Sequence, residues 1–292
     1  MLYPAPTVAA AEGGVDSRAA RRRRACGILY PPMPGILSST ADAAGALPAA
    51  LPLPPHPPLR RYYEGESEHR RRIDDWFDHA AGAYDWITQV MSFGSGHRYR
   101  RQVLLRAGLQ RGMRVLDLGC GTGVLAAHSQ GIVGSGGRVA ALDPSIGMLR
   151  QAAGRGVRLR IRGLAEQLPF RGERFDLLSM GYALRHVTDL RAAFGEFRRV
   201  LRRGGKLLLL EITPPPSPVA FRLVKLYLGG AVPLVARLRG GRTAQELMRY
   251  YWDTIERCVQ PAVILDALAQ SGFVDAARRV EHGILSEYTA TR

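Results

Sequence analysis

The stretch that decides the fold is Val115–Ala127, which reads VLDLGCGTGVLAA. It begins with apolar residues typical of a strand, passes through Gly119, Gly121 and Gly123, and ends in residues that favour a helix. Glycines at a strand-to-helix turn let the backbone bend sharply and approach a ligand, because no Cβ stands in the way. The stretch therefore predicts a strand, a ligand-binding turn and a helix.

Two acidic residues accompany this turn. Asp117 precedes the first glycine, and Asp143 ends the next expected strand, 20 residues after Gly123. The spacing is GxGxG rather than the dinucleotide-binding GxGxxG, and a carboxylate at Asp117 would repel a pyrophosphate but accept a hydrogen bond from an amino group. A carboxylate at Asp143 is placed to bind ribose hydroxyls. S-adenosylmethionine has a ribose, a cationic portion and no phosphate, and we expect it as the cofactor.

The rest of the chain extends the strand–helix alternation. Strands are expected at 114–118, 138–143, 157–162, 175–181 and 205–212, and helices at 123–130, 145–154 and 190–201. Such alternation predicts a doubly wound α/β fold, with a mostly parallel sheet covered by helices on both faces.

The flanking regions differ from this pattern. Glu68 to Arg111 is expected to be helical, and residues 213–260 are expected to form a small helical cap or lid. After a helix at 261–271, the strands 273–279 and 284–291 are close in sequence and should form an antiparallel pair.

Composition separates an N-terminal tail from the folded part. Residues 1–60 are rich in Ala, Pro and Arg, which predicts a disordered tail before a domain at 61–292; a dispensable segment, a wrongly assigned start and a targeting segment are the alternatives. Of the net charge of +16, the tail carries +3, which leaves +13 on the domain. That charge attracts an anionic membrane or nucleic acid, but no aromatic and basic platform for nucleic acid accompanies it. The three cysteines fit a reducing cytoplasm.

Residues 219–238 combine apolar side chains with basic ones. The stretch reads VAFRLVKLYLGGAVPLVARL and is interrupted by glycines and a proline, so we expect it to be too short and too charged to span a membrane. An interfacial segment or a lid over a greasy substrate is one interpretation, and an ordinary cap packing on the sheet is the other. The first predicts peripheral contact at the inner face of the cell membrane.

Several motifs carry a resemblance to a known family. They are FDHAAGAYD at Phe77–Asp85, MSFG at Met91–Gly94, YALRHVTD at Tyr182–Asp189 and FRRVLRRGGKLLLLE at Phe197–Glu211. From about residue 74 to 292, the chain resembles the ubiquinone/menaquinone biosynthesis C-methyltransferases, a family of class I S-adenosylmethionine-dependent methyltransferases. The resemblance implies a Rossmann-like sheet and a methyl transfer in quinone biosynthesis.

The resemblance also implies site residues. Besides Asp117, Asp143 and the three glycines, those expected to bind the cofactor are Thr122, Met148, Leu164, Ala165 and Gly181. The family usually has Asn or Asp at the position of Leu164 and often Ser at that of Gly181. It also has Asn at the position of His186.

Three residues are candidates for catalysis. C-methylation of a phenol or hydroquinone requires removal of a ring-hydroxyl proton, and His186 has the pKa range of a general base. Arg185 is expected to lower the pKa of the phenol by its charge or to position a water, and Tyr84 to close over the cofactor. The other histidines show no ligand spacing, so no structural metal is expected.

The expected function is S-adenosylmethionine-dependent C-methylation of a prenylated quinol or a similar aromatic. Two alternatives keep the resemblance but change the role. The first is amino transfer from S-adenosylmethionine that converts ubiquinone to rhodoquinone, and the second is a non-catalytic, membrane-associated subunit of a quinone-synthesis complex. The oligomeric state is left open.

Overall fold

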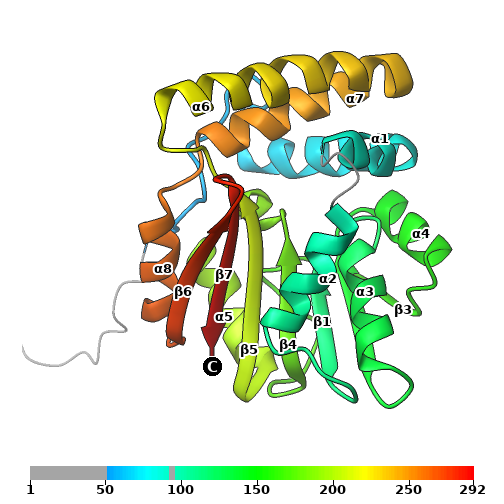
Figure 1. Cartoon of the computed structure of the whole chain (residues 1–292), viewed down its shortest axis with the longest axis vertical. Helices are drawn as coiled ribbons and strands as arrows, with labels where there is room; N and C mark the ends of the chain where they lie inside the picture. The colour runs from blue at the N-terminus through cyan, green and yellow to red at the C-terminus, as the bar shows by residue number, and fades with distance from the viewer. Residues whose placement is uncertain (1–50, 92–95) are drawn as a thin grey trace, which may run out of the picture. The chain divides into compact units, whose positions relative to one another are not determined.

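The strands form one mixed sheet in the computed structural model, which describes residues 51–91 and 96–292 (Figure 1). Their order is β3-β2-β1-β4-β5-β7-β6. The strands are β1 Arg114–Leu118, β2 Arg138–Asp143, β3 Leu159–Arg162, β4 Phe175–Gly181, β5 Leu201–Ile212, β6 Val274–Glu281 and β7 Leu285–Thr291. The first five run parallel, and β7 pairs antiparallel with both β5 and β6. The expected doubly wound sheet with an antiparallel C-terminal pair is confirmed.

Helices cover both faces of the sheet because consecutive residues of the central strands, which point to opposite faces, are mostly apolar and buried. The helices beside the sheet are α2 Gly96–Arg106, α3 Val124–Val133, α4 Ile146–Gly154, α5 Leu190–Val200 and α8 Pro261–Gln270. On one face, Leu116 and Leu118 pack with α5 and α8; on the other, Val115 packs with α2 and α3.

The site is positioned by the centre of this sheet. β1 pairs with β2 on one side and with β4 on the other, so the connections from β1 and from β4 leave in opposite directions. In such sheets, ligands bind beyond the carboxyl ends of the strands at this switch point. Asp117, Asp143 and Gly181 lie at these three neighbouring strand ends.

A helical layer lies over the carboxyl ends of the strands (Figure 1). It consists of α1 Glu66–Met91, α6 Pro218–Val224, the π-helical segment Lys225–Ala231 and α7 Val232–Glu256. Helix α1 packs along α7, and Ile73, Ile87, Leu247 and Tyr250 belong to their shared apolar core. The expected cap at 213–260 is thus helical.

The expected helical region from Glu68 to Arg111 is wrong at its C-terminal end. Among the described residues, α1 runs to Met91 and α2 from Gly96 to Arg106, and turns and irregular chain occupy 107–113. Gly108, two residues after the last residue of α2, adopts a φ of 89°, and this left-handed conformation ends the helix.

Part of the expected tail packs on the domain. The Leu53 N–H donates to Asp189 Oδ1 at 3.0 Å, and the Leu53 carbonyl accepts from Leu190 N at 2.9 Å. The Pro55 carbonyl accepts from Val259 N at 2.8 Å, and Leu59 is buried. Residues 1–50 of the expected tail, and Ser92–Gly94 of the MSFG motif, lie outside the described residues.

These contacts change the expected effect of truncation. A chain that begins at Leu51 should have the same unfolding free energy as the full chain. A chain that begins at Arg61 should lose about 2 kcal/mol of unfolding free energy, because it lacks the buried apolar side chain of Leu59. Urea denaturation of the two truncated chains measures the difference. Equal stability of both would contradict a structural role for 51–60.

Candidate active site

A pocket lies at the carboxyl ends of β1, β2 and β4, beneath α1. Counted out to its open mouth, it encloses about 1260 Å³. It is lined by all of the sequence-predicted site residues except two: Tyr84, Asp117, Gly119, Gly121, Thr122, Asp143, Met148, Leu164, Ala165, Gly181 and His186. The exceptions, Gly123 and Arg185, lie behind its wall.

The three glycines of the turn have different surroundings, although all have positive φ values. A Cβ on Gly119 would lie 2.5 Å from the Ala183 Cβ, and one on Gly123 would lie 2.8 Å from the Ala152 Cβ. A Cβ on Gly121 would meet no atom within 4 Å. Gly123 therefore serves the packing of the turn against α4, and its expected cofactor contact is not seen in the pocket lining. Gly121 presents bare backbone.

Asp117 is completely buried at the end of β1. Its Oδ1 accepts a hydrogen bond from Ser179 Oγ at 2.7 Å, and its Oδ2 has no hydrogen-bond partner of standard geometry among residues 51–91 and 96–292. Burial raises the pKa of Asp117 to about 7, against the lowering effect of the Ser179 hydroxyl and the Ala126 N–H. A buried carboxylate oxygen of this kind is suited to a cationic N–H donor.

Asp143 holds the glycine turn from the neighbouring strand end. Its Oδ2 accepts from Gly121 N at 2.8 Å, and its Oδ1 accepts from Ser145 N at 2.9 Å. Burial raises the pKa of Asp143 to about 6, while these two N–H groups lower it. Each oxygen keeps acceptor capacity for one more donor.

The pocket residues fit the expected cofactor. A buried oxygen at Asp117 can take an ammonium, two oriented oxygens at Asp143 can take ribose hydroxyls, and open backbone at Gly121 allows close approach. Leu164 and Ala165 add an apolar wall beyond β3, where a purine ring can lie.

Helix α1 is fastened over the pocket by two acids of the motif Phe77–Asp85. Asp85 accepts from Thr122 Oγ1 at 2.5 Å and pairs with the Arg155 guanidinium at 2.5 Å. Asp78 accepts from the Ser145 hydroxyl and, at 2.8 Å, from Gly147 N. The Thr122 hydroxyl thus contacts α1. The motif carried this signal, but the sequence analysis assigned no role to either acid.

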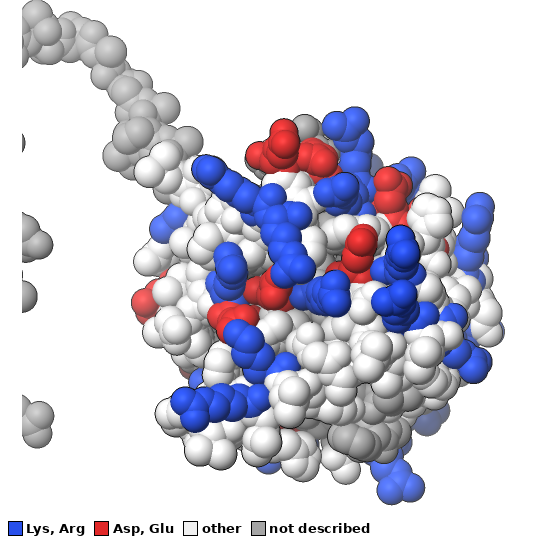
Figure 2. All heavy atoms as spheres, turned by 90° about the horizontal axis from the view of Figure 1, so that it is seen from above, with Lys and Arg blue, Asp and Glu red and all other residues white. Residues whose placement is uncertain are grey.

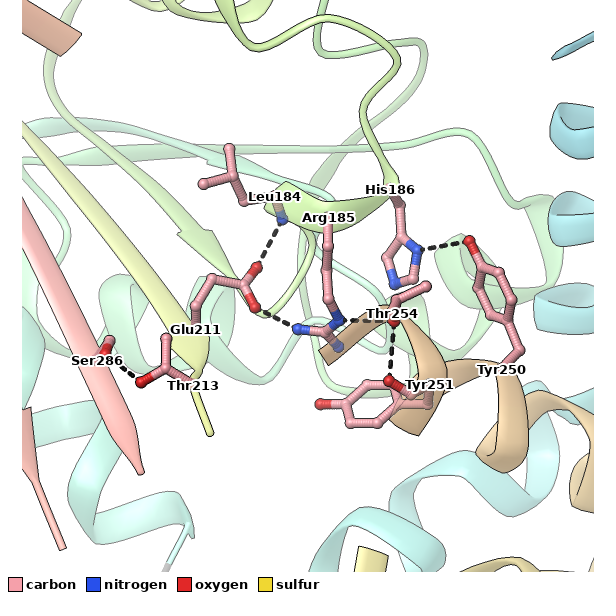
Figure 3. A network of polar contacts seen from close by, with 9 residues as sticks. All are labelled: Leu184, Arg185, His186, Glu211, Thr213, Tyr250, Tyr251, Thr254 and Ser286. Carbon is pink, nitrogen blue, oxygen red and sulfur yellow. Dashed lines mark hydrogen bonds and ion pairs between the residues drawn. The ribbon is translucent and has the colours of Figure 1, made fainter. Parts of the chain in front are cut away.

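His186 lies in the pocket wall next to two aromatic rings. Its ring stacks on Tyr250 at a centroid distance of 5.7 Å (Figure 3). It also meets the edge of the Phe77 ring at 5.5 Å. Nδ1 lies 3.4 Å from the Tyr250 hydroxyl, and Nε2 is buried. The side chain must therefore turn before a ring nitrogen can reach an acceptor in the pocket.

Arg185 does not line the pocket, and its side chain points toward Glu211 and Thr254 (Figure 3). Its guanidinium is buried in an ion pair with Glu211, its Nε donates to Thr254 Oγ1 at 3.1 Å, and its Cζ lies 4.2 Å from the Tyr251 ring centroid. In this position it does not line the pocket, so direct contact with a substrate is not seen, whereas the expected action on a phenol by its charge or through a water stays a prediction. The side chain instead joins the segment after β4 to β5 and α7.

Tyr84, Tyr182 and Arg100 also line the pocket. Tyr84 packs edge-on against Phe77 at 5.9 Å, and burial raises its pKa above the ordinary value. Tyr182 has a φ of 62°, which is rare for a residue with a Cβ, and its ring lies 5.1 Å from the Arg100 Cζ. The sequence analysis assigned no site role to Tyr182, although it begins the motif Tyr182–Asp189. It also missed Arg100, because this residue stands among other arginines in a pattern typical of a solvated helix face.

Comparisons with known proteins agree with this geometry. Residues 65–292 match the model of the ubiE/COQ5 methyltransferase family. A ubiquinone/menaquinone biosynthesis C-methyltransferase of Hahella chejuensis is 32% identical over 70% of this chain and 85% of its own length. A demethylmenaquinone methyltransferase of Mycolicibacterium paratuberculosis is 32% identical over 76% of this chain and 94% of its own length.

Solved structures share the fold. A methyltransferase of Thermotoga maritima, described as a possible histamine N-methyltransferase, superposes with a TM-score of 0.54 at 19% identity over 74% of this chain and 98% of its own. The phosphoethanolamine N-methyltransferase 2 of Haemonchus contortus, solved with S-adenosylmethionine, gives 0.52 at 16% identity over 74% of this chain and 57% of its own. Together with the family match, these findings make the chain a member of the ubiE/COQ5 methyltransferase family, an enzyme that uses S-adenosylmethionine.

Proposed function

We propose that the enzyme methylates a ring carbon of a prenylated hydroquinone in quinone biosynthesis. The observation that supports this most is the aromatic and apolar wall beside the cofactor turn, formed by Phe77, Tyr84, Tyr182, His186 and Val187. A flat hydroquinone ring packs well against such a wall. The names of the matched relatives point to the same acceptor class.

The chain's own residues have distinct tasks in this reaction. When bound, the cofactor supplies an electrophilic methyl group. We assign the ribose to Asp143 and the ammonium to Asp117, which together fix the cofactor across β2 and β1. Helix α1 covers the pocket and limits access of water, so that donor and acceptor are aligned for an in-line displacement.

The ring hydroxyl must lose its proton for the neighbouring ring carbon to become nucleophilic. After this carbon has taken the methyl group, its own hydrogen leaves as a proton, the aromatic ring is restored and the ring oxygen is protonated again. We assign the hydroxyl proton to His186, the histidine in the pocket wall, whose ring turns from Tyr250 toward the acceptor. Phe77 packs against both His186 and Tyr84, so the three side chains line the same part of the pocket beside the proposed acceptor position.

Lipid-quinone profiling of a strain that lacks the gene tests the acceptor class. The proposed function predicts accumulation of a demethylated quinone and its disappearance when the gene is restored. An unchanged quinone profile would contradict it.

We further propose that the enzyme meets this lipid at an anionic membrane through the outer helical face, defined as the exposed Val219, Leu223, Leu226, Leu234 and Leu238 of α6, the π-helical segment and α7. These side chains are 58–84% exposed. By length and composition, the helical run Pro218–Glu256 is apolar enough to cross a membrane, which corrects the reading of residues 219–238 alone as too short and too charged. However, the inner face of α7 packs on α1, which favours contact along the membrane surface over a span.

Basic side chains flank the outer helical face. They are Arg222, Lys225, Arg237 and Arg239. Figure 2 shows this side of the molecule from above, where Lys and Arg outnumber Asp and Glu. Each basic group near an anionic surface contributes about 1 kcal/mol, and exposed leucines add apolar insertion.

Replacing these four basic residues by Gln is expected to abolish sedimentation with anionic liposomes at low salt, whereas the unaltered enzyme should sediment and be released at high salt. A matched control replaces Arg111, Arg114, Arg138 and Arg203, which are exposed near the amino ends of β1, β2 and β5. Equal binding by both variants would show that only total charge matters, and would contradict the outer helical face as the contact.

A further inference from the structure

Arg100 is a cation in the pocket wall that has no acidic partner among the described residues. It extends from α2, is partly buried and lies against the Tyr182 ring. No carboxylate of the described residues forms an ion pair with its guanidinium, although ten other ion pairs occur in the same part of the chain. A partly desolvated guanidinium facing a cavity is suited to an anionic ligand group.

The strand order indicates which ligand group lies near Arg100. Asp143 stands at the end of β2, Asp117 at the end of β1, and Gly181 and Tyr182 at the end of β4, in that spatial order. With the ribose at Asp143, as proposed above, the amino acid portion of the cofactor extends toward β1 and β4. Arg100 contacts Tyr182 at that end.

Charge complementarity also indicates which group of the cofactor lies next to Arg100. The amino acid portion carries an ammonium and a carboxylate on the same carbon atom, so their partners must lie close together. The positive charge of Arg100 lowers the pKa of Asp117, so the two groups are close enough to interact. Asp117 has a buried oxygen available for the ammonium. The Asp117 carboxylate and the Arg100 guanidinium at one end of the pocket therefore complement the two opposite charges of a zwitterion.

We propose that Arg100 binds the carboxylate of the methionine portion of S-adenosylmethionine. This rests on the proposed orientation of the cofactor and adds a partner that the glycine turn and the two acids do not supply. The anionic oxygen of a deprotonated acceptor has the same chemistry, and the experiment separates the two sources.

Calorimetry with two adenosine thioethers tests the proposal. S-adenosylhomocysteine has the amino acid portion, and 5′-methylthioadenosine lacks it. Replacing Arg100 by Gln should weaken S-adenosylhomocysteine binding by about 10- to 100-fold, because a hydrogen-bonded charge pair is lost, and leave 5′-methylthioadenosine binding unchanged. Arg100→Lys should restore part of the lost affinity, since the charge remains but the planar fork does not.

The controls are Arg98→Gln and Arg101→Gln, which remove exposed charges from the same helix and should alter neither affinity. Unchanged S-adenosylhomocysteine binding by Arg100→Gln would overturn the proposal, and a raised KM for the acceptor would then assign Arg100 to the acceptor oxygen. Equal losses for both thioethers would also overturn it. Because no acceptor is present during the binding measurement, these results do not depend on the identity of the quinone.

Discussion

Replacing Glu211 by alanine is expected to lower the free energy of unfolding by about 3–5 kcal/mol. Glu211 pairs with Arg185, and both side chains are almost fully buried. Burial alone would lower the pKa of Arg185, but the Glu211 carboxylate raises it above the ordinary value, so the guanidinium stays charged. The substitution leaves this charge buried without its counterion, and also removes the acceptor of Leu184 N.

The matched control removes both charges. Arg185→Met combined with Glu211→Leu fills the same space with apolar atoms and should recover most of the lost stability, as replacement of a whole buried pair is often near neutral. Urea denaturation of the single and double variants measures the difference. A single variant within about 1 kcal/mol of the unaltered enzyme would contradict the importance of the pair.

Asp143→Ala is expected to weaken the binding of S-adenosylhomocysteine by about 30- to 100-fold, equivalent to about 2–3 kcal/mol. The substitution removes the proposed ribose contact and also the acceptor for the Gly121 and Ser145 N–H groups, which hold the turn in shape. Calorimetry measures this affinity, with Asp266→Ala on the exposed face of α8 as a control. Affinity near that of the unaltered enzyme would remove Asp143 from the cofactor site.

Local sequence signals were sufficient for much of the fold. The strand, the glycine turn and the helix at Val115–Ala127 are decided by side-chain period and by backbone conformations that glycine favours. The acids at Asp117 and Asp143 could be placed together because adjacent parallel strands end at one edge of the sheet.

Features that depend on distant residues could not be predicted in the same way. Arg185 is positioned by Glu211 and Thr254, which follow 26 and 69 residues later, and no local pattern distinguishes a buried arginine from one in a pocket. Gly123 belonged to the motif, but its neighbour Ala152 decides its packing.

The segment 51–60 illustrates a related limit. Its prolines removed hydrogen-bond donors and favoured an extended chain, which the sequence analysis interpreted as disorder. An extended chain can also lie along a domain surface, and Leu53 and Pro55 do so through backbone hydrogen bonds to α5 and to Val259. The partners lie more than a hundred residues away, so the pattern could not reveal them.

The most direct test of the proposed reaction follows the methyl group. The purified enzyme is incubated with a demethylated prenyl hydroquinone in anionic vesicles and with S-adenosylmethionine that carries an isotopically labelled methyl group, and the lipid product is analysed by mass spectrometry and NMR. The expected product carries one labelled methyl group on a ring carbon. A labelled methyl group on oxygen, or a product that has gained nitrogen and no label, would contradict C-methylation as the function of this enzyme.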